Sequence, residues 1–292
     1  MNAAATMIEA LVTRVLPRLC VCADDFGLHP AVNEAVLRLA AQGRLHATSA
    51  MVGAPAWQAG ATDLSRLDAT DIDVGLHLDL TEYPLTVPAK GLGWWLLHGP
   101  RRVPALHREV HAQLDAFEQT LGRMPAFVDG HQHVHQFPGV RDALLTVLAD
   151  RYPAHHPWLR STRHGGRGFK PWVINTLGRR GLERDAAALD FAFNRRLLGV
   201  YDFRGNTTDY QRHLQGWLAA ARDGDLLMCH PATALVPGDA IAAARCQEFL
   251  VWSAGELDAW LSHHTLQLAP MSRTLKRPPP LWDTAPALLL GH

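Results

Sequence analysis

One short segment of the chain carries four side chains that could bind a metal ion or transfer protons. Asp129, His131, His133 and His135 occupy every second position of DGHQHVH, directly after the apolar run AFV. If this segment stays extended, alternation places all four side chains on one face. A lone histidine usually serves a satisfied hydrogen bond. Three of them beside an aspartate favour metal binding or acid–base chemistry, because imidazole binds metals and titrates near neutral pH.

Two adjacent aspartates, Asp24 and Asp25, end another apolar run, RLCVCADDFG. A buried carboxylate without a partner is costly, which excludes both from an ordinary apolar core. Neighbouring residues of a strand face opposite ways, so we expect the two side chains to diverge. One interpretation makes them a metal ligand and a base, and the other makes them a capping residue beside a solvated one. The segment alone leaves both interpretations open.

Two more histidines end apolar runs in the same way. His77 lies in GLHLDLTE and His230 lies in LLMCHPA, where a proline follows it. Each has a structural alternative when it is taken singly, and each gains weight from its place after an apolar run. Arg245 follows His230 on a predicted helix, so it could reach the same place or pair with Glu248.

Short apolar runs alternate with helical patterns along the chain, as expected for right-handed βαβ units and a parallel sheet. About seven such repeats predict an α/β protein with a closed or nearly closed, TIM-barrel-like (β/α) barrel. No G-x-G-x-x-G follows the first run, which disfavours an open dinucleotide-binding sheet. The runs predicted as strands span residues 18–27, 45–53, 72–81, 126–137, 156–163, 225–232 and 265–270. In a barrel the carboxyl ends of the strands meet at one face, so we expect the polar residues that follow them to share one cleft.

Composition narrows the class of function. The chain has 292 residues, 48% of them hydrophobic, and 28 basic residues balance 28 acidic ones. Without net charge, no field draws the chain to nucleic acid or to an anionic membrane. No run approaches the ~20 apolar residues of a membrane span, and the first residues make a poor signal peptide, so we expect a cytoplasmic protein. We expect a single domain over residues 18–292 after an extension over residues 1–17.

The four cysteines include no C-x-x-C pair, and Cys20 and Cys22 alternate along the first predicted strand. That spacing indicates small core residues rather than a disulfide framework. Two segments interrupt the alternation of elements, one at 84–108 and an arginine-rich one at 164–200. Both follow strands, so we expect them at the barrel mouth as lids or dimer contacts, with no nucleic acid bound. Trp94–Trp95 could stack on a sugar or pack locally.

Four motifs together carry a resemblance to a known family. CADDFGLHPAVNEAV, VGLHLDLTE, FVDGHQHVHQFP and MCHPA occur in this order, and the chain resembles the YdjC-like carbohydrate deacetylase family from about Arg18 to about Pro270. That family includes chitooligosaccharide deacetylases and a branch associated with hopanoid biosynthesis, and the long insertion and the end of the chain are more similar to the second. The resemblance implies a deformed (β/α) barrel, hydrolysis of N-acetyl groups, one divalent ion that is usually magnesium, and often a homodimer.

Carried over by position, the resemblance implies Asp25, His77 and His131 as metal ligands and Asp24 as the candidate base. His230 matches the late-strand histidine, which would protonate the leaving amine. Two nitrogen ligands suit zinc better than magnesium, so both ions stay open. The remaining polar residues of the predicted cleft would contact substrate or hold the ligands in place: Asp129, His133, His135 and Arg245.

These residues permit removal of an N-acetyl group from an acetylated amino sugar on an oligosaccharide or glycolipid. A bound ion would lower the pKa of water and polarise the acetamide carbonyl. Asp24 would take the proton of the water and His230 would give one to the amine. A phosphoesterase and a sugar-binding barrel without turnover are the alternatives. The spare carboxylate of Asp24 disfavours simple binding, and the small number of strand-end carboxylates disfavours a two-metal phosphoesterase.

Overall fold

The protein is an α/β barrel built from parallel strands and surrounding helices. The structure, a computed structural model, describes residues 16–98, 103–164 and 178–275. Every strand pairing among these residues is parallel, as the alternation of strands and helices predicts. The strands are β1 (Arg18–Phe26), β2 (Ala47–Ala50), β3 (Asp73–Leu78), β4 (Phe127–Gly130), β5 (Trp158–Leu159), β6 (Leu197–Leu198), β7 (Asp225–Cys229) and β8 (Gln267–Leu268).

The sheet curls until its two ends meet. Seven strands follow the order β5-β4-β3-β2-β1-β7-β6, and β8 pairs with the start of β1. The segments around β5 and β6 lie beside each other, because the Leu159 N–H donates to the carbonyl of Ala192 at 2.9 Å and the Leu197 N–H donates to that of Arg163 at 2.7 Å. The prediction of about seven strands in a nearly closed barrel is confirmed.

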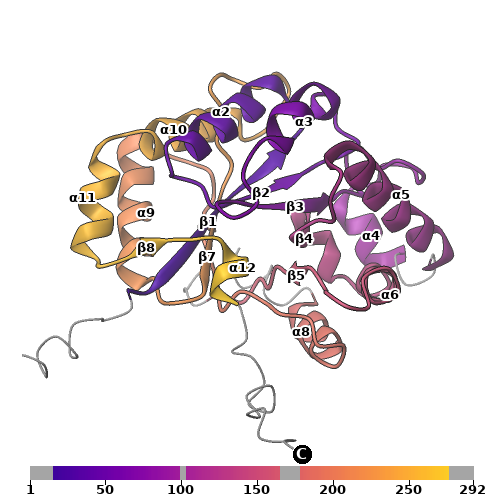
Figure 1. The fold of residues 1–292 in the computed structure, drawn as a ribbon. Helices are drawn as coiled ribbons and strands as arrows, with labels where there is room; N and C mark the ends of the chain where they lie inside the picture. Colours follow the sequence, from indigo (N-terminus) through magenta and orange to yellow (C-terminus); the bar gives the residue numbers. More distant parts are fainter. Residues whose placement is uncertain (1–15, 99–102, 165–177, 276–292) are drawn as a thin grey trace, which may run out of the picture.

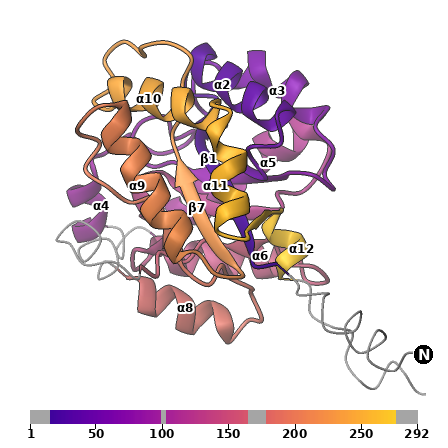
Figure 2. The same cartoon turned by 90° about the vertical axis from the view of Figure 1, so that its left-hand side faces the viewer.

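Helices surround the strands, as Figure 1 shows. They are α2 (Pro30–Ala41), α3 (Trp57–Ser65), α4 (Leu92–His98), α5 (Val103–Leu121), α6 (Val140–Arg151), α8 (Arg179–Ala187), α9 (Thr207–Ala220), α10 (Ala242–Trp252), α11 (Glu256–His263) and α12 (Met271–Thr274). A 3₁₀ helix, η2 (His131–Gln136), directly follows β4. In Figure 2, α4 and α12 lie at opposite ends of the barrel. Within the described ranges, no helix is both long enough and apolar enough to cross a membrane.

Strand β1 contributes side chains to two separate apolar clusters. Leu19, Val21 and Ala23 pack outward against the helices, whereas Cys20 and Cys22 face into the barrel. This confirms the prediction that both cysteines are core residues, and all four cysteines of the chain are free. The interior cluster is small and closely packed: Cys20, Cys22, Ala47, Phe127, Trp158, Leu197, Leu226, Met228 and Met271.

Beyond this apolar layer, the inward positions of the strands become polar. On β1, for example, Cys20 and Cys22 are followed two residues later by Asp24, and on β4 Phe127 is followed by Asp129. Because alternate residues of a strand share a face, these polar side chains form the next layer toward the carboxyl ends of the strands. The inward positions of this layer are occupied by Asp24, Ser49, His77, Asp129, Arg160 and His230.

The two predicted insertions contribute differently to the barrel mouth. Segment 84–108 contains α4 and the start of α5, and Leu92 of α4 lines the cavity at the mouth, whereas residues 99–102 lie outside the described ranges. Part of segment 164–200 belongs to the barrel itself, because this segment contains helix α8 and, near its end, strand β6. A strand of two residues carries no periodic signal, so the sequence pattern missed β6. Residues 165–177 lie outside the described ranges.

Gly75 on β3 makes room for a ring inside the barrel. A Cβ atom at this position would lie 2.5 Å from the ring of Phe127, which itself stacks on Trp158 with a centroid distance of 4.2 Å. We therefore expect Gly75→Ala to lower the free energy of unfolding by about 1–3 kcal/mol, as overpacking does. Urea denaturation followed by circular dichroism measures this change. Gly216→Ala on α9 is the control, because that glycine has open space around it and should tolerate alanine.

Candidate active site

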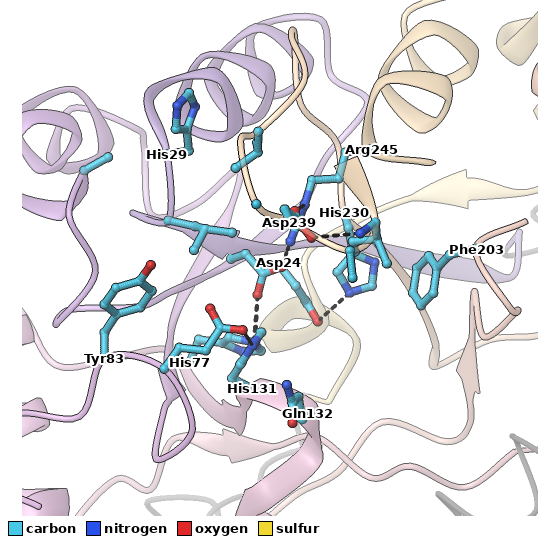
Figure 3. Close-up of a pocket in the computed structure, with 18 of the residues that line it drawn as sticks. Asp24, His29, His77, Tyr83, His131, Gln132, Phe203, His230, Asp239 and Arg245 are labelled. Carbon is cyan, nitrogen blue, oxygen red and sulfur yellow. Dashed lines mark hydrogen bonds and ion pairs between the residues drawn. The ribbon is translucent and has the colours of Figure 1, made fainter. Parts of the chain in front are cut away.

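A cavity of about 990 Å³ opens at the carboxyl ends of the strands. Figure 3 shows side chains from β1, β3, η2 and the end of β7 pointing into it, with Tyr83 and His29 on one side and Phe203 on the other. The cavity therefore collects residues that lie far apart in the chain, as the barrel architecture predicts. The predicted residues that line it are Asp24, Asp25, His77, His131, His133, His230 and Arg245.

A β-bulge brings both adjacent aspartates to this cavity. The pairing of β1 with β2 shifts register between Ala23 and Phe26, and Asp25 has a left-handed backbone with φ of 69°. The expectation that the two side chains diverge is wrong, because the bulge re-aims Asp25 toward the side on which Asp24 already lies. Both carboxylates are almost completely buried, with 2% and 1% exposure.

Asp25, His77 and His131 place three ligand atoms around one point. Asp25 Oδ1 lies 3.3 Å from His77 Nε2 and 3.1 Å from His131 Nδ1, and the three ligating atoms all lie within 4.8 Å of one another. The second oxygen of Asp25 accepts a hydrogen bond of 2.7 Å from the Arg245 guanidinium. Asp25 therefore presents one oxygen toward the two imidazoles and keeps the other on an arginine.

Each of these imidazoles contacts a second carboxylate through its other ring nitrogen. His77 Nδ1 lies 2.6 Å from Asp129 Oδ1, and His131 Nε2 lies 3.1 Å from Glu82 Oε1. Metal-binding histidines are typically oriented in this way, because the outer carboxylate fixes the tautomer and the ring direction. Asp129 thus serves as an outer partner of His77. Sequence reasoning missed Glu82, although it stands in the quoted motif GLHLDLTE.

The electrostatics of the group also fit a cation. Burial alone would lower the pKa of His77, but the carboxylates of Asp129, Asp25 and Asp24 outweigh it and raise the pKa to about 9. The pKa of His131 is likewise raised, against its burial, by Asp25 and Glu82. Both shifts report negative charge that exceeds the local positive charge. A divalent ion would neutralise this excess, so the donor atoms and their charges fit the predicted metal.

Asp24 has a different partner. Its two oxygens accept hydrogen bonds from Arg160, with NH1 at 2.5 Å from Oδ2 and NH2 at 2.6 Å from Oδ1. Burial would raise the pKa of Asp24, but the Arg160 guanidinium outweighs burial and holds the pKa below its ordinary value. Asp24 is therefore held in its ionised form by Arg160. Sequence reasoning missed Arg160, and the signal that could have found it is its inward register, two residues after Trp158.

His230 lies on the other side of Asp24. Its Nε2 atom is 3.9 Å from Asp24 Oδ2, and the ring of Phe203 packs edge-on at a centroid distance of 5.3 Å (Figure 3). The backbone N–H of His230 donates to Glu248 at 2.5 Å, and the Tyr201 hydroxyl donates to the same carboxylate at 2.7 Å. The end of β7 is thereby anchored, and His230 faces the cavity beside Asp24.

The segment after Asp129 does not remain extended. Strand β4 ends at Gly130, and η2 contains left-handed backbone at Gln132 (φ 52°) and His133 (φ 61°). The expected single face of four side chains is therefore wrong, because the chain coils after the strand. His133 lines the cavity, and burial together with Arg160 lowers its pKa well below the usual value. His135 is instead buried below, where its Nε2–H donates to the carbonyl of Arg160 at 2.9 Å.

Two further sequence alternatives are decided by the contacts. Arg245 reaches the cavity, where it pairs with Asp25 and Asp239 rather than with Glu248. The tryptophan pair packs locally, because Trp95 is buried with its Nε1–H donating to the Leu80 carbonyl at 2.7 Å and its ring meets Trp94 edge-on.

Comparisons with known proteins agree with the fold and identify the family. The chain is 31% identical to the carbohydrate deacetylase of Mus musculus, with 86% of this chain and 93% of the relative aligned, and 30% identical to that of Homo sapiens, with 88% and 91% aligned. A crystal structure from Enterococcus faecalis V583, named for cellobiose-phosphate cleavage, shares the fold with a TM-score of 0.65 at 20% identity, covering 88% of this chain and 98% of that one. The profile of the family described as YdjC-like protein matches residues 18–268, and the chain belongs to that family.

Proposed function

We propose that this YdjC-like protein is a metal-dependent carbohydrate deacetylase that hydrolyses the N-acetyl group of an acetylated amino sugar. The observation that carries the proposal is the position of the ionised Asp24 between a cation-binding group and His230 at one cavity. The relatives in mouse and human, both named carbohydrate deacetylase, support the reaction class. Hydrolysis of an amide needs a polarised carbonyl, a base for water and an acid for the leaving nitrogen, and the cavity offers residues for each task.

Asp25, His77 and His131 would hold the ion. Their ligating atoms face one another, and the outer carboxylates of Asp129 and Glu82 hold the two rings in orientation. When bound, a divalent ion supplies Lewis-acid polarisation of the acetyl carbonyl and a lower pKa for water. Oxygen from Asp25 suits magnesium and the two imidazoles suit zinc, so the proposal includes both ions.

Asp24 and His230 would carry the protons. Asp24 takes a proton from the attacking water while the water oxygen forms its bond to the acetyl carbon. His230 gives a proton to the nitrogen as the carbon–nitrogen bond breaks, so acetate and the free amine leave. Arg160 keeps Asp24 ionised and oriented. His133, neutral because its pKa is depressed, is placed to hydrogen-bond substrate at the cavity wall.

The arginine at Asp24 argues against a two-metal phosphoesterase. Arg160 forms ion pairs with both Asp24 and Asp129 at 2.5 and 2.6 Å, which occupies the carboxylates that a second ion would need. A sugar-binding barrel without turnover would need neither an ionised spare carboxylate nor a histidine beside it. Both observations favour single-ion amide hydrolysis over the two alternatives.

The side chains that line the cavity affect which group attached to the sugar can bind there. Apart from the polar residues around the ion group, the cavity is lined largely by apolar side chains: Leu28, Pro30, Pro55, Ala56, Ala59, Leu92, Val200, Met228, Val236, Pro237 and Ile241. Such a surface favours a substrate that extends beyond one sugar and includes an apolar part. The proposal therefore includes glycolipids beside N-acetylated oligosaccharides.

Acetate release is the direct test. The purified protein, loaded with Mg²⁺ or Zn²⁺, is incubated with N-acetylglucosamine, its oligosaccharides and N-acetylglucosaminyl lipids, and acetate is measured enzymatically. We expect acetate from at least one of these substrates, and loss of that activity when a chelator removes the ion. Release of phosphate from a phosphomonoester panel without acetate release would replace the proposal by the phosphoesterase alternative. Sugar binding without release of either product would indicate a binding barrel.

A further inference from the structure

A second group of potential metal ligands lies directly beneath the first. Asp24, His77 and Asp129 place one ligand atom each within 4.8 Å of one another, and all three residues are buried. This group shares His77 with the proposed ion site, so the two groups are adjacent. Two carboxylates and an imidazole in such an arrangement are a normal donor set for a divalent ion.

In this protein the guanidinium of Arg160 lies between two members of this second group, Asp24 and Asp129. Arg160 has no exposed surface, and its NH2 atom lies 2.6 Å from Asp24 Oδ1 and 2.6 Å from Asp129 Oδ2. The backbone of Arg160 is fixed on both sides, because its N–H donates to the Val128 carbonyl at 3.2 Å and its carbonyl accepts from His135 at 2.9 Å. The backbone of Arg160 is therefore held in place, and its buried side chain lies between the two carboxylates.

The two arginines of the site divide the adjacent aspartates between two tasks. Arg245 takes only Oδ2 of Asp25 and leaves Oδ1 beside the imidazoles of His77 and His131. Arg160 engages both oxygens of Asp24. Because both oxygens of Asp24 already accept hydrogen bonds from a guanidinium, Asp24 is a poorer ligand for an ion than Asp25, which keeps one oxygen free of arginine. The adjacent aspartates Asp24 and Asp25 thus have different hydrogen-bond partners, although they lie in the same bulge.

We propose that Arg160 is a built-in cation that closes a latent second metal site and so prevents Asp24 from acting as a metal ligand. Two buried carboxylates require a compensating positive charge, and arginine supplies one that does not dissociate and cannot be deprotonated. Without it, Asp24, Asp129 and His77 Nδ1 would accept a second divalent ion, with the imidazole of His77 bridging the two ions after its Nδ1 proton is released to solvent. This inference rests on the proposed single-ion site of Asp25, His77 and His131.

The stoichiometry of bound metal tests the inference. Wild type, Arg160→Met and Arg160→Lys are each dialysed against Zn²⁺ or Mn²⁺, and the bound metal is measured by mass spectrometry. We expect one ion per chain for wild type and for Arg160→Lys, which keeps a positive charge, and two for Arg160→Met, which keeps only the volume. Asp24→Asn added to Arg160→Met should return the count to one. For Mn²⁺, electron paramagnetic resonance of Arg160→Met should show the spin coupling of a neighbouring ion pair.

Several outcomes would overturn the inference. A folded Arg160→Met protein that binds one ion shows that no latent site exists, and a wild type that binds two shows that Arg160 does not close it. An Arg160→Met protein that is unfolded without metal should refold and melt at a higher temperature when metal is added, and failure of metal to restore it also counts against the inference. A wild type that binds no ion would instead contradict the proposed function itself.

Discussion

Asp24→Asn should lower kcat for acetate release by about 10²–10⁴-fold while the bound metal stays near the wild-type level. General-base assistance is typically worth this factor, and an amide cannot accept the proton of the attacking water. Asp24 contributes no atom to the group of Asp25, His77 and His131, so the ion should remain. Arg160 keeps Asp129 as a partner, and for that reason the fold should survive with reduced stability.

The measurements are kcat for acetate release, metal content by mass spectrometry and thermal unfolding, all on the same preparation. Ser49→Ala is the matched control, because the Ser49 hydroxyl lies 3.3 Å from Asp24 Oδ1 and 3.1 Å from His77 Nδ1 and its loss changes no charge. It should cost far less activity. If Asp24→Asn retains both metal and full activity, Asp24 is not the base. His133, which lines the cavity, then becomes the next candidate in place of the buried His135.

Asp25→Asn should lose metal and activity together. The substitution removes the charged oxygen that lies within 3.3 Å of both imidazoles, and it also leaves Arg245 with only Asp239. Loss of an outer partner of a ligand typically lowers metal affinity by ~10–100-fold, so loss of a ligand should lower it by more. Isothermal titration with Zn²⁺ or Mg²⁺ measures the affinity, and acetate release at increasing metal concentration shows how much activity the ion restores.

Asp239→Asn separates the two effects of this change. It also removes one of the two carboxylate partners of Arg245, but Asp239 is not among the three proposed ligands, so metal affinity should change much less than in Asp25→Asn. Equal losses of affinity in the two variants would mean that Asp25 acts through Arg245 and does not bind the ion. If Asp25→Asn keeps its metal while Asp24→Asn loses it, the two aspartates have exchanged roles.

Much of the fold follows from local patterns. The alternation of apolar runs with helical spacing is a property of each segment, and it correctly predicts parallel strands, a barrel and a shared face for Asp24, His77 and His230. Hydrophobic periodicity does not detect the shortest strands, because a strand of two residues, such as Leu197–Leu198, has no period. Their pairing depends on neighbours far away in the chain.

Local sequence patterns do not predict the side-chain directions in the site. Alternation predicts that Asp24 and Asp25 diverge and that Asp129 to His135 share a face, yet both segments leave regular strand geometry where β1 and β4 end. Bulges and left-handed residues are common where strands end at active sites, and the surrounding structure must compensate their strain. Sequence spacing therefore identified the chemical groups but assigned the wrong directions to several of them.

The sequence by itself determined the barrel and the types of residue at its mouth, because these depend on hydrophobic periodicity and strand order. Only the tertiary structure decided which group contacts which. Arg160 lies outside the quoted motifs, and Glu82 ends the motif that contains His77. The importance of both residues arises from lying beside Asp24 and His131. Ion pairs between distant segments depend on distances of a few ångströms in the folded barrel, and spacing along the chain does not encode such distances.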